Sequence, residues 1–465
     1  MSLRRRDIVR LLAPALGALL LAATVPAVAL ARGGGGSGGF GGGGGGGGRG
    51  GGFGGGGYYG GGGAVGGGIA LGVIVLIVIG VVLISALGGA IGTRQYRKRR
   101  RRRERQVELA AAEAADEDEA FASDRVHSDA EQLFRDIQTA WDNGDRKRLA
   151  QLVGSDLMVE WTRRLDHLDA KGWHNHVEVS GPVHVEYVGL VNRAEDQEDR
   201  VCVRIESKLL DVVIDRQGNH IKRSDSTSET SRMAEYWTLE KPDALGRTAG
   251  APEWILLSIE QDKEGIHELD EPIVASPWSD TERIREKAVT EQAAGEKVPE
   301  GFTVADAADL SFEGDARQAA LDLSLADGRF APDVLETEIR RAVSAWAEAV
   351  DGDDSDLRAL ARPEAVEALL YPGDATHTHR LVVRGPQVRG LRVTGLDAKS
   401  EPPSMTVEFE VHGRRYIEDR DTTTIVSGSQ DRATTFTERW TLALEGDDEH
   451  PWRIASASAP AGATR

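Results

Sequence analysis

The sequence predicts an α+β protein in which two tandem domains follow an amino-terminal membrane-targeting region. Three observations support this fold class. Two segments each begin with a helix pair and continue with alternating, strand-like stretches that favour an antiparallel sheet. Their tryptophan and proline landmarks recur at nearly the same spacing. Ahead of both segments lies an uncharged apolar stretch of 23 residues, 69–91.

Residues 1–31 have the pattern of a secretory signal peptide. A basic start is followed by an apolar segment that ends in an A-x-A sequence at Ala29–Ala31. An uncleaved first membrane helix is the alternative, although Pro14 and Pro26 disfavour a continuous helix. Residues 32–68 are mostly glycine and cannot build a packed core, so we expect a flexible, disordered tract there.

Residues 69–91 are predicted to form a single transmembrane helix. At 1.5 Å per residue, 23 apolar residues span the roughly 30 Å of hydrocarbon in a bilayer. The run "RQYRKRRRRRERQ", residues 94–106, begins three residues later and holds nine Lys/Arg and one acid. Positive charge beside a span stays on the cytoplasmic side. We therefore expect a cell (inner or plasma) membrane protein whose domains, after Arg94, are cytoplasmic.

Charge is distributed unevenly along the chain, whose formal net charge is −19. Residues 1–106 contain 15 Lys/Arg and 2 Asp/Glu, whereas the remainder contains 41 and 73. An acidic body is a poor partner for phosphate backbones, so no nucleic-acid partner is predicted. The basic run instead predicts a stop-transfer signal. We also hypothesise that it binds anionic lipid headgroups at the membrane surface through Arg97, Lys98, Arg99, Arg100, Arg101, Arg102 and Arg103.

The spacing of landmarks places the two domains. Trp141 precedes Pro182 by 41 residues and Trp237 by 96, while Trp346 precedes Pro386 by 40 and Trp440 by 94. Self-similarity at this distance predicts a duplicated domain of about 130 residues, large enough to bury its own core. A basic then acidic helical spacer, whose acidic part is solvated, is expected at 92–123. The first copy is expected at 124–262, a linker with short helices at 263–330, and a diverged second copy at 331–460.

Six tryptophans recur in the two copies and are predicted to mark the cores. The alternative is an aromatic lining that faces a ligand inside each domain. The six are Trp141, Trp237, Trp254, Trp346, Trp440 and Trp452.

Two stretches of the first copy, "FRDIQTAWDNGDRKRLAQLV" and "EYWTLEKPD…EWILLSIEQ", resemble the bacterial Tim44-like domain family over residues 129–262. The second copy keeps Trp346, Glu438, Trp440 and Trp452. The resemblance implies a cone-shaped fold similar to nuclear transport factor 2. It also implies a membrane-associated binding or tethering role, with protein translocation or envelope protein assembly as the nearest context. The chaperone-recruiting regions of the mitochondrial relative are not recognisable here, so that partner is not predicted.

Two H-x-H pairs are the most suggestive chemical motif. His174 with His176, and His377 with His379, each precede a Gly-Pro dipeptide. Residues two apart on a strand share a face, so each pair could offer two imidazoles to Zn²⁺. No spacing singles out a third ligand from candidates such as His184 and His167. We therefore favour polar residues at the entry to a strand and predict no metal site.

Catalytic residues and cofactors are not predicted. Asp211, Asp215 and Glu206 lie on candidate strands and could act as pocket acids, but charged strand residues usually face solvent. Cys202, the single cysteine, is expected to be a small core residue.

The leading hypothesis is a non-enzymatic, membrane-anchored protein that binds an unknown protein partner or apolar ligand near the bilayer. A small-molecule enzyme of the isomerase or dehydratase type is one alternative. A structural envelope protein, in which the glycine tract acts outside the cell, is the other.

Overall fold

The computed structural model describes residues 92–221, 230–242, 252–297, 304, 316–350 and 354–458. The predicted signal peptide, glycine tract and transmembrane helix all fall outside these residues. Among the helices that the structure describes, none has both the length and the apolar character needed to cross a bilayer.

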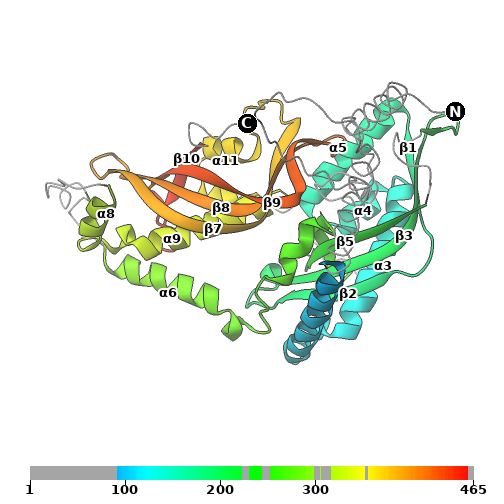
Figure 1. The fold of residues 1–465 in the computed structure, drawn as a ribbon, viewed down its shortest axis with the longest axis horizontal. Coiled ribbons are helices and arrows are strands. Elements are labelled where there is room, and N and C mark those ends of the chain that lie inside the picture. The colour runs from blue at the N-terminus through cyan, green and yellow to red at the C-terminus, as the bar shows by residue number, and fades with distance from the viewer. Residues whose placement is uncertain are drawn as a thin grey trace, which may run out of the picture.

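The first domain packs helices against a six-stranded antiparallel sheet (Figure 1). Strand β3 is central, because β1, β2, β4 and β5 all pair with it and β6 continues from β5. The helices are α3 (Ser123–Asp142), α4 (Arg146–Leu152) and α5 (Ser155–Lys171). The strands are β1 (His174–Val179), β2 (His184–Val191), β3 (Arg200–Ile214), β4 (His220–Ile221), β5 (Thr230–Glu240) and β6 (Ile255–Gln261).

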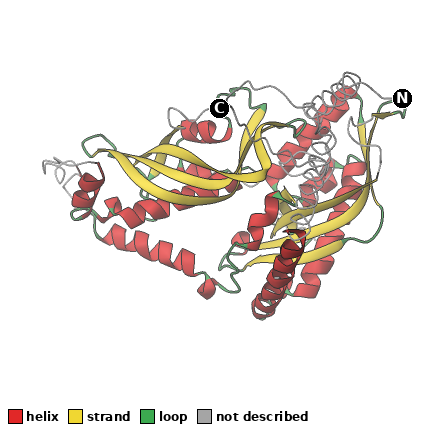
Figure 2. Cartoon of the chain, in the orientation of Figure 1, coloured by secondary structure: helices red, strands yellow, loops and turns green. Residues whose placement is uncertain are grey.

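The second domain repeats this arrangement with four strands in the order β7-β8-β9-β10 (Figure 2). Its order matches β1/β2-β3-β5-β6, which confirms the predicted duplication of an α+β unit. The helices are α8 (Ala316–Ser324), α9 (Pro332–Glu348), α10 (Ser355–Leu360) and α11 (Pro363–Leu370). The strands are β7 (His379–Asp397), β8 (Ser404–Asp419), β9 (Ile425–Ala443) and β10 (Arg453–Ser458).

The segment between the domains, predicted as a linker with short helices, contains helical elements. Two 3₁₀ turns, η3 (Glu264–Leu269) and η4 (Pro277–Ser279), precede the longer helix α6 (Thr281–Gly295). Figure 1 shows α6 running beside α9.

The Gly-Pro dipeptide has different effects in the two domains. Gly181 and Pro182 lie between β1 and β2, and Gly181 has a φ of 141°, so the chain bends and two strands form. Gly385 and Pro386 instead lie inside β7, where the pairing with β8 shifts register after Arg384. Proline has no backbone N–H to donate to the neighbouring strand. The second sheet therefore has a β-bulge at the position where the first sheet has a turn between two strands.

All six predicted core tryptophans are buried, with at most 2% of each residue exposed. Aromatic rings occupy the space between helices and sheet in both domains. The ring centroids of Trp141 and Trp161 lie 5.3 Å apart, and those of Trp346 and Trp440 lie 6.0 Å apart. Edge-to-face contacts at such distances are typical of packed cores.

The repeated E-x-W motif closes a hydrogen bond within one strand. The Trp237 indole Nε1 donates to Glu235 Oε2 at 3.1 Å, and Trp440 Nε1 donates to Glu438 Oε2 at 3.3 Å. Side chains two residues apart point to the same face of a strand, which brings each pair together. Both glutamates are buried, so in each domain one carboxyl group inside the core accepts a hydrogen bond from the central indole.

Each domain begins earlier than the sequence analysis places it. A 3₁₀ turn, η1 (Glu119–Phe121) or η5 (Gly328–Phe330), packs its phenylalanine edge-to-face on the tryptophan that leads into the last strand. Trp254 Nε1 donates to the Ala120 carbonyl at 3.2 Å, and Trp452 Nε1 donates to the Arg329 carbonyl at 2.8 Å. These turns therefore belong to the domain cores and not to the spacer or linker.

The helix over residues 92–114 also differs from expectation, because it packs on the first domain. Val107, Ala111 and Ala114 are fully buried in that core. The prediction of a solvated spacer over residues 107–123 is therefore wrong. Two of these three buried residues are alanines with acidic neighbours. The buried face of the helix is therefore not recognisable as an apolar face from the sequence.

Replacement of Glu235 tests the E-x-W hydrogen bond. Glu235→Ala leaves the buried Trp237 indole without its acceptor, and such a group costs about 1–3 kcal/mol. We expect a lower midpoint of thermal unfolding for the full chain, whereas Glu235→Gln keeps an acceptor oxygen and should lose less. Equal midpoints for the two variants would contradict this account.

Candidate functional site

The inner face of the helix over residues 92–114 is fixed to the first domain by polar contacts. Arg103 Nε donates to the Val188 carbonyl at 2.7 Å, and Arg100 Nη2 lies 3.2 Å from Glu186 Oε1. The Tyr96 hydroxyl lies 2.7 Å from the Tyr236 hydroxyl. It also donates to Asp262 Oδ1 at 3.1 Å. These contacts hold the helix along β2 (Figure 1).

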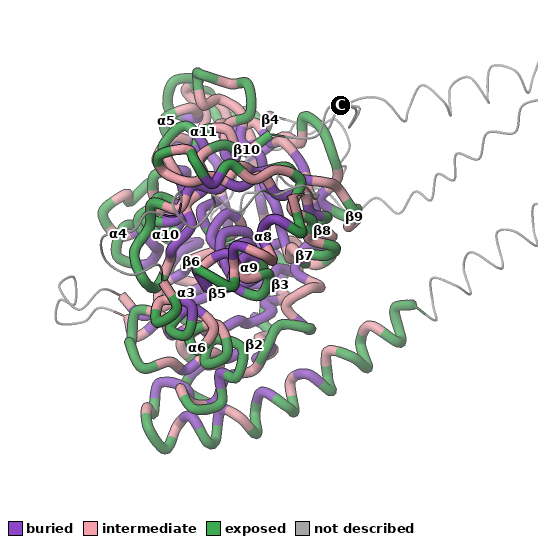
Figure 3. The backbone as a smooth tube through the Cα atoms, turned by 90° about the vertical axis from the view of Figure 1, so that its left-hand side faces the viewer, coloured by how far each residue is buried: buried purple, intermediate pink, exposed green. Residues whose placement is uncertain are grey.

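The opposite face of this helix carries an exposed stripe of bases. Arg97, Lys98, Arg101 and Arg102 are exposed and recur at helical spacing, and we call them the outer basic stripe. Figure 3 shows buried and exposed positions alternating along this helix. The seven bases predicted to contact lipid are thus divided. Four form the stripe, Arg99 pairs with Asp270, and Arg100 and Arg103 face the domain.

The first H-x-H pair lies beside a carboxylate from another element. His174 and His176 begin β1, and Asp142 is the last residue of α3. Asp142 Oδ1 lies 2.8 Å from His176 Nδ1 and 3.4 Å from His174 Nε2, and it accepts from the Val177 amide at 3.0 Å. The clustered donors include neither His184 nor His167. Sequence spacing could not reveal Asp142, because the fold alone joins the two elements.

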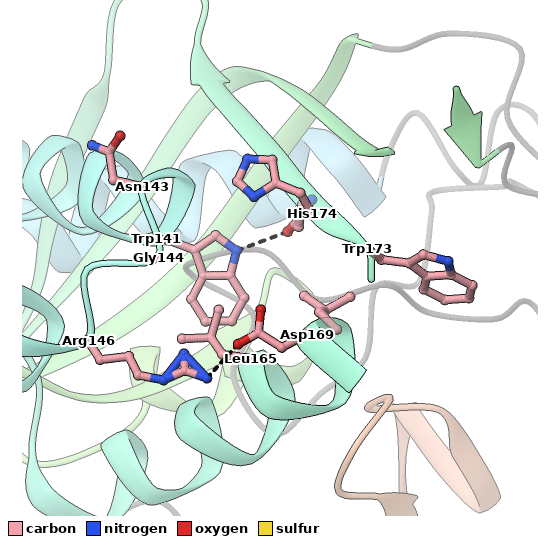
Figure 4. A pocket seen from close by; sticks show the side chains of 10 residues that line it. Trp141, Asn143, Gly144, Arg146, Leu165, Asp169, Trp173 and His174 are labelled. Carbon is pink, nitrogen blue, oxygen red and sulfur yellow. Dashed lines mark hydrogen bonds and ion pairs between the residues drawn. The ribbon is translucent and has the colours of Figure 1, made fainter. Parts of the chain in front are cut away.

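A small cavity of about 280 Å³ lies next to His174 (Figure 4). Trp141 forms one wall, and its indole Nε1 donates to Asn175 Oδ1 at 3.0 Å. Arg146 and Asp169 also line the cavity and form an ion pair at 3.0 Å. The cavity therefore has an aromatic wall and a polar mouth.

The second H-x-H pair is arranged differently. His377 Nε2 lies 2.7 Å from Glu367 Oε2, whereas His379 Nδ1 lies 3.0 Å from Asp374 Oδ2. The His377 ring also stacks on Tyr371, with centroids 4.0 Å apart. Because each imidazole has its own carboxylate, this pair does not converge on one point.

The acidic residues considered as catalytic candidates each have different partners and do not form one site. Asp211 is buried and accepts from Asn175 Nδ2 at 2.9 Å. Glu206 pairs with Arg204 and Arg232, and Asp215 accepts amide hydrogen bonds within an exposed turn. Cys202 is buried, and burial raises the pKa of its thiol well above the usual value, so it remains a protonated core residue.

The sequence analysis missed a buried group of charges between the two domains. Glu160 on α5 accepts from Arg420 Nη2 at 2.5 Å and lies 3.4 Å from Arg380 Nη1. Arg163 pairs with Asp421 beside them. Glu160, Arg380 and Arg420 each have less than a tenth of their surface exposed.

The same interface continues at η3, which the sequence analysis assigned to the linker. Glu264 accepts from the Tyr416 hydroxyl at 2.6 Å and from Gln430 Nε2 at 2.9 Å. His267 approaches Gly385 so closely that a Cβ there would lie 2.4 Å from the imidazole Cγ. We call the buried charges Glu160, Glu260, Glu264, His267, Arg380, Arg384 and Arg420 the interdomain seam.

Ionisation in the seam follows from burial and charge. Burial opposes ionisation of Glu160, but Arg380 and Arg420 outweigh it and hold its pKa at about 2. Burial raises the pKa of Glu264 to about 7, and the charge of Glu260 adds to this shift. Burial lowers the pKa of His267, but Glu260 at 2.7 Å outweighs it and raises that pKa well above its usual value.

A family model for the Tim44-like domain matches residues 107–261 and again residues 317–459. The two matches together cover more than half of the chain. The chain belongs to the Tim44-like domain family. The matched segments begin near where burial places the domains, at the buried Val107 and one residue into α8. The resemblance found in the sequence, including its duplication, is thus confirmed.

Comparison with other proteins adds little beyond the family. No curated protein matches the sequence significantly. One similar solved structure is described as an "Ntf2 like protein involved in plasmid conjugation". It has 10% identity and a TM-score of 0.16, and the match covers 73% of this chain and 98% of that chain. Tim44-like domains are generally non-catalytic and suggest a binding role related to translocation.

The seam should weaken as the pH rises from about 4.5 through 7. The pKa of Glu264 is about 7 in the folded chain against an ordinary 4.5, so its stabilisation is full below pH 4.5 and is lost as the pH rises through 7. The raised pKa of His267 acts in the same direction. Hydrogen exchange of η3, corrected for intrinsic rates, should be faster at pH 8 than at pH 5.

Glu264→Gln provides the control for this experiment, because the amide cannot ionise. Its η3 exchange should depend less on pH than that of the unmodified chain. Identical pH dependence in both proteins would exclude Glu264 as the titrating group.

Proposed function

We propose that this protein is a membrane-anchored binding protein that holds two joined Tim44-like domains at the cytoplasmic face of the cell membrane. The observation that carries the proposal is the outer basic stripe. It lies on a helix that follows the predicted transmembrane segment 69–91 directly and is fixed to the first domain. The stripe would thus meet the headgroup region as the chain leaves the bilayer.

The charge of the stripe suits an anionic membrane surface. A base near such a surface contributes about 1 kcal/mol, so four exposed bases contribute about 4 kcal/mol. Arg100 and Arg103 are not included, because they contact Glu186 and the Val188 carbonyl. This refines the lipid hypothesis from seven bases to Arg97, Lys98, Arg101 and Arg102.

The docked helix and the seam together support a tethering role. Tyr96, Arg100 and Arg103 fix the helix to the first domain, and the seam fixes the second domain to the first. A partner bound by either domain would therefore be held at a set position near the bilayer. The family supports a binding role related to translocation, and we propose a protein partner in translocation or envelope assembly as the biological context.

A small-molecule enzyme is the second candidate, and one observation favours it. His174 and Asp142 lie together at the edge of the 280 Å³ cavity. Against it, 26% of the Asp142 side chain is exposed, so it is not the buried carboxylate that acid–base catalysis in such folds uses.

The lipid role of the stripe predicts a dependence on membrane charge. The full chain would be placed in nanodiscs of anionic or zwitterionic lipid, and hydrogen exchange of residues 94–106 measured. We expect slower exchange on the anionic lipid, because headgroup contacts stabilise the helix. Replacing Arg97, Lys98, Arg101 and Arg102 with Gln should reduce the difference between lipids, while Arg94 and Arg105, which are also exposed on this helix, are left in place.

The matched control replaces four exposed bases elsewhere, Arg285, Lys287, Arg389 and Arg439, with Gln. It changes the net charge equally and should leave the lipid dependence intact. A reporter fused to the carboxyl terminus should also read cytoplasmic. An external signal, or a lipid dependence as large after loss of the stripe as before, would refute the proposal.

A further inference from the structure

We propose that Asp142, His174 and His176 form a zinc-binding site on the first domain. The site is independent of the proposed membrane role, because none of its residues belongs to the outer basic stripe or the interdomain seam. It lies where the carboxyl end of α3 meets the start of β1.

The donor atoms lie close to the separations that a zinc ion requires, although the 2.8 Å hydrogen bond between His176 Nδ1 and Asp142 Oδ1 must open by about 0.5 Å to admit the ion. A tetrahedral ion with bonds of about 2.0–2.2 Å places its ligand atoms about 3.3 Å apart. Asp142 Oδ1 lies 2.8 Å from His176 Nδ1 and 3.4 Å from His174 Nε2, and all three donors lie within 4.8 Å of one another. Two imidazoles and one carboxylate are also a donor set of open zinc sites.

The backbone already holds the ligands in place. His174 and His176 lie opposite Ile214 and Val212 in the β1–β3 ladder, so both project from the same face. Their rings are 6.4 Å apart between centroids and inclined by only 27°. The carboxylate is fixed by the Val177 amide, which donates to Asp142 Oδ1 at 3.0 Å. Little rearrangement is needed for an ion to bind.

The intervening residue makes this part of the strand rigid. Asn175 accepts from the Trp141 indole and donates to Asp211, so it is fixed on the buried side of β1. These contacts hold the backbone between the two histidines in place. The ligand side chains themselves remain accessible, with 48% of His174, 39% of His176 and 26% of Asp142 exposed. An ion could therefore enter from solvent.

An ion bound there would have an open coordination position. The protein supplies three ligands, and zinc prefers four. His174 also lines the cavity of about 280 Å³, so the fourth ligand would be water or a small oxygen or nitrogen donor in or beside that cavity (Figure 4).

Two other groups of similar residues are less suited to an ion. In the second domain, His377 and His379 pair with different carboxylates, Glu367 and Asp374. At the seam, Glu260, His267 and Glu268 also bring their donor atoms within 4.8 Å of one another, but the positive charge of Arg384, 3.6 Å from Glu260, opposes a cation there. The H-x-H pair of the second domain is therefore a natural control.

The test is a competition titration of Zn²⁺ between a chromogenic chelator and the untagged full chain in detergent. We expect one tight site per chain. His174→Ala or His176→Ala should weaken it by more than the about 10- to 100-fold that loss of an outer-shell contact costs. The double variant of His377 and His379 to Ala should bind as the unmodified chain does. Substituting Co²⁺ should give the visible absorption of a tetrahedral ion.

Thermal unfolding separates lost ligands from lost structure. Zn²⁺ should raise the unfolding midpoint of the unmodified chain, because a ligand of the folded state stabilises it. Asp142→Asn keeps an oxygen for the Val177 amide, so its midpoint in chelator should be unchanged while its zinc affinity falls. The proposal is overturned if the chain binds no Zn²⁺. It also fails if binding survives both histidine substitutions, or if the His377/His379 variant loses it equally.

Discussion

The arrangement of the two domains depends on buried carboxylates in one domain that are neutralised by arginines of the other. Glu160 is almost wholly buried, and Arg380 and Arg420 approach it from the second domain. An unpaired carboxylate in such a place costs several kcal/mol, so separating the domains requires water to reach these groups. The two domains therefore form one body and are not independent units joined by a flexible linker. Charge pairs of this kind fix one geometry more than they add stability, because their desolvation offsets much of their attraction.

The duplicated domains differ in an informative way. Contacts shared by both copies lie inside the cores. They include the E-x-W hydrogen bond and the phenylalanine that packs on the last tryptophan. Contacts that differ lie at the H-x-H pairs and around the Gly-Pro dipeptides. The second Gly-Pro has become part of the seam, since Gly385 admits the His267 ring. The two copies thus share their internal framework and differ at their surfaces.

Sequence patterns predicted the duplicated fold and the identity of the aromatic core, because strand alternation and tryptophan spacing are local signals. They failed where a contact depends on tertiary packing. Phe121 and Phe330 each stand outside a regular apolar pattern, and η3 looks like an acidic linker until its glutamates meet the second domain. Asp142 and His176 are likewise brought together only when α3 packs against β1. A single sequence contains no signal for such pairs.

The hydrogen bond between Tyr96 and Asp262 joins the two ends of the first domain. Asp262 is followed directly by Lys263, whose carbonyl accepts from Arg414, and then by Glu264 of the seam. A tilt or a pull applied to the helix at residue 96 is therefore transmitted to the junction of the domains through three adjacent residues. The same helix also contacts the sheet at Tyr236 and Val188, so its position is coupled both to the sheet and to the junction of the two domains.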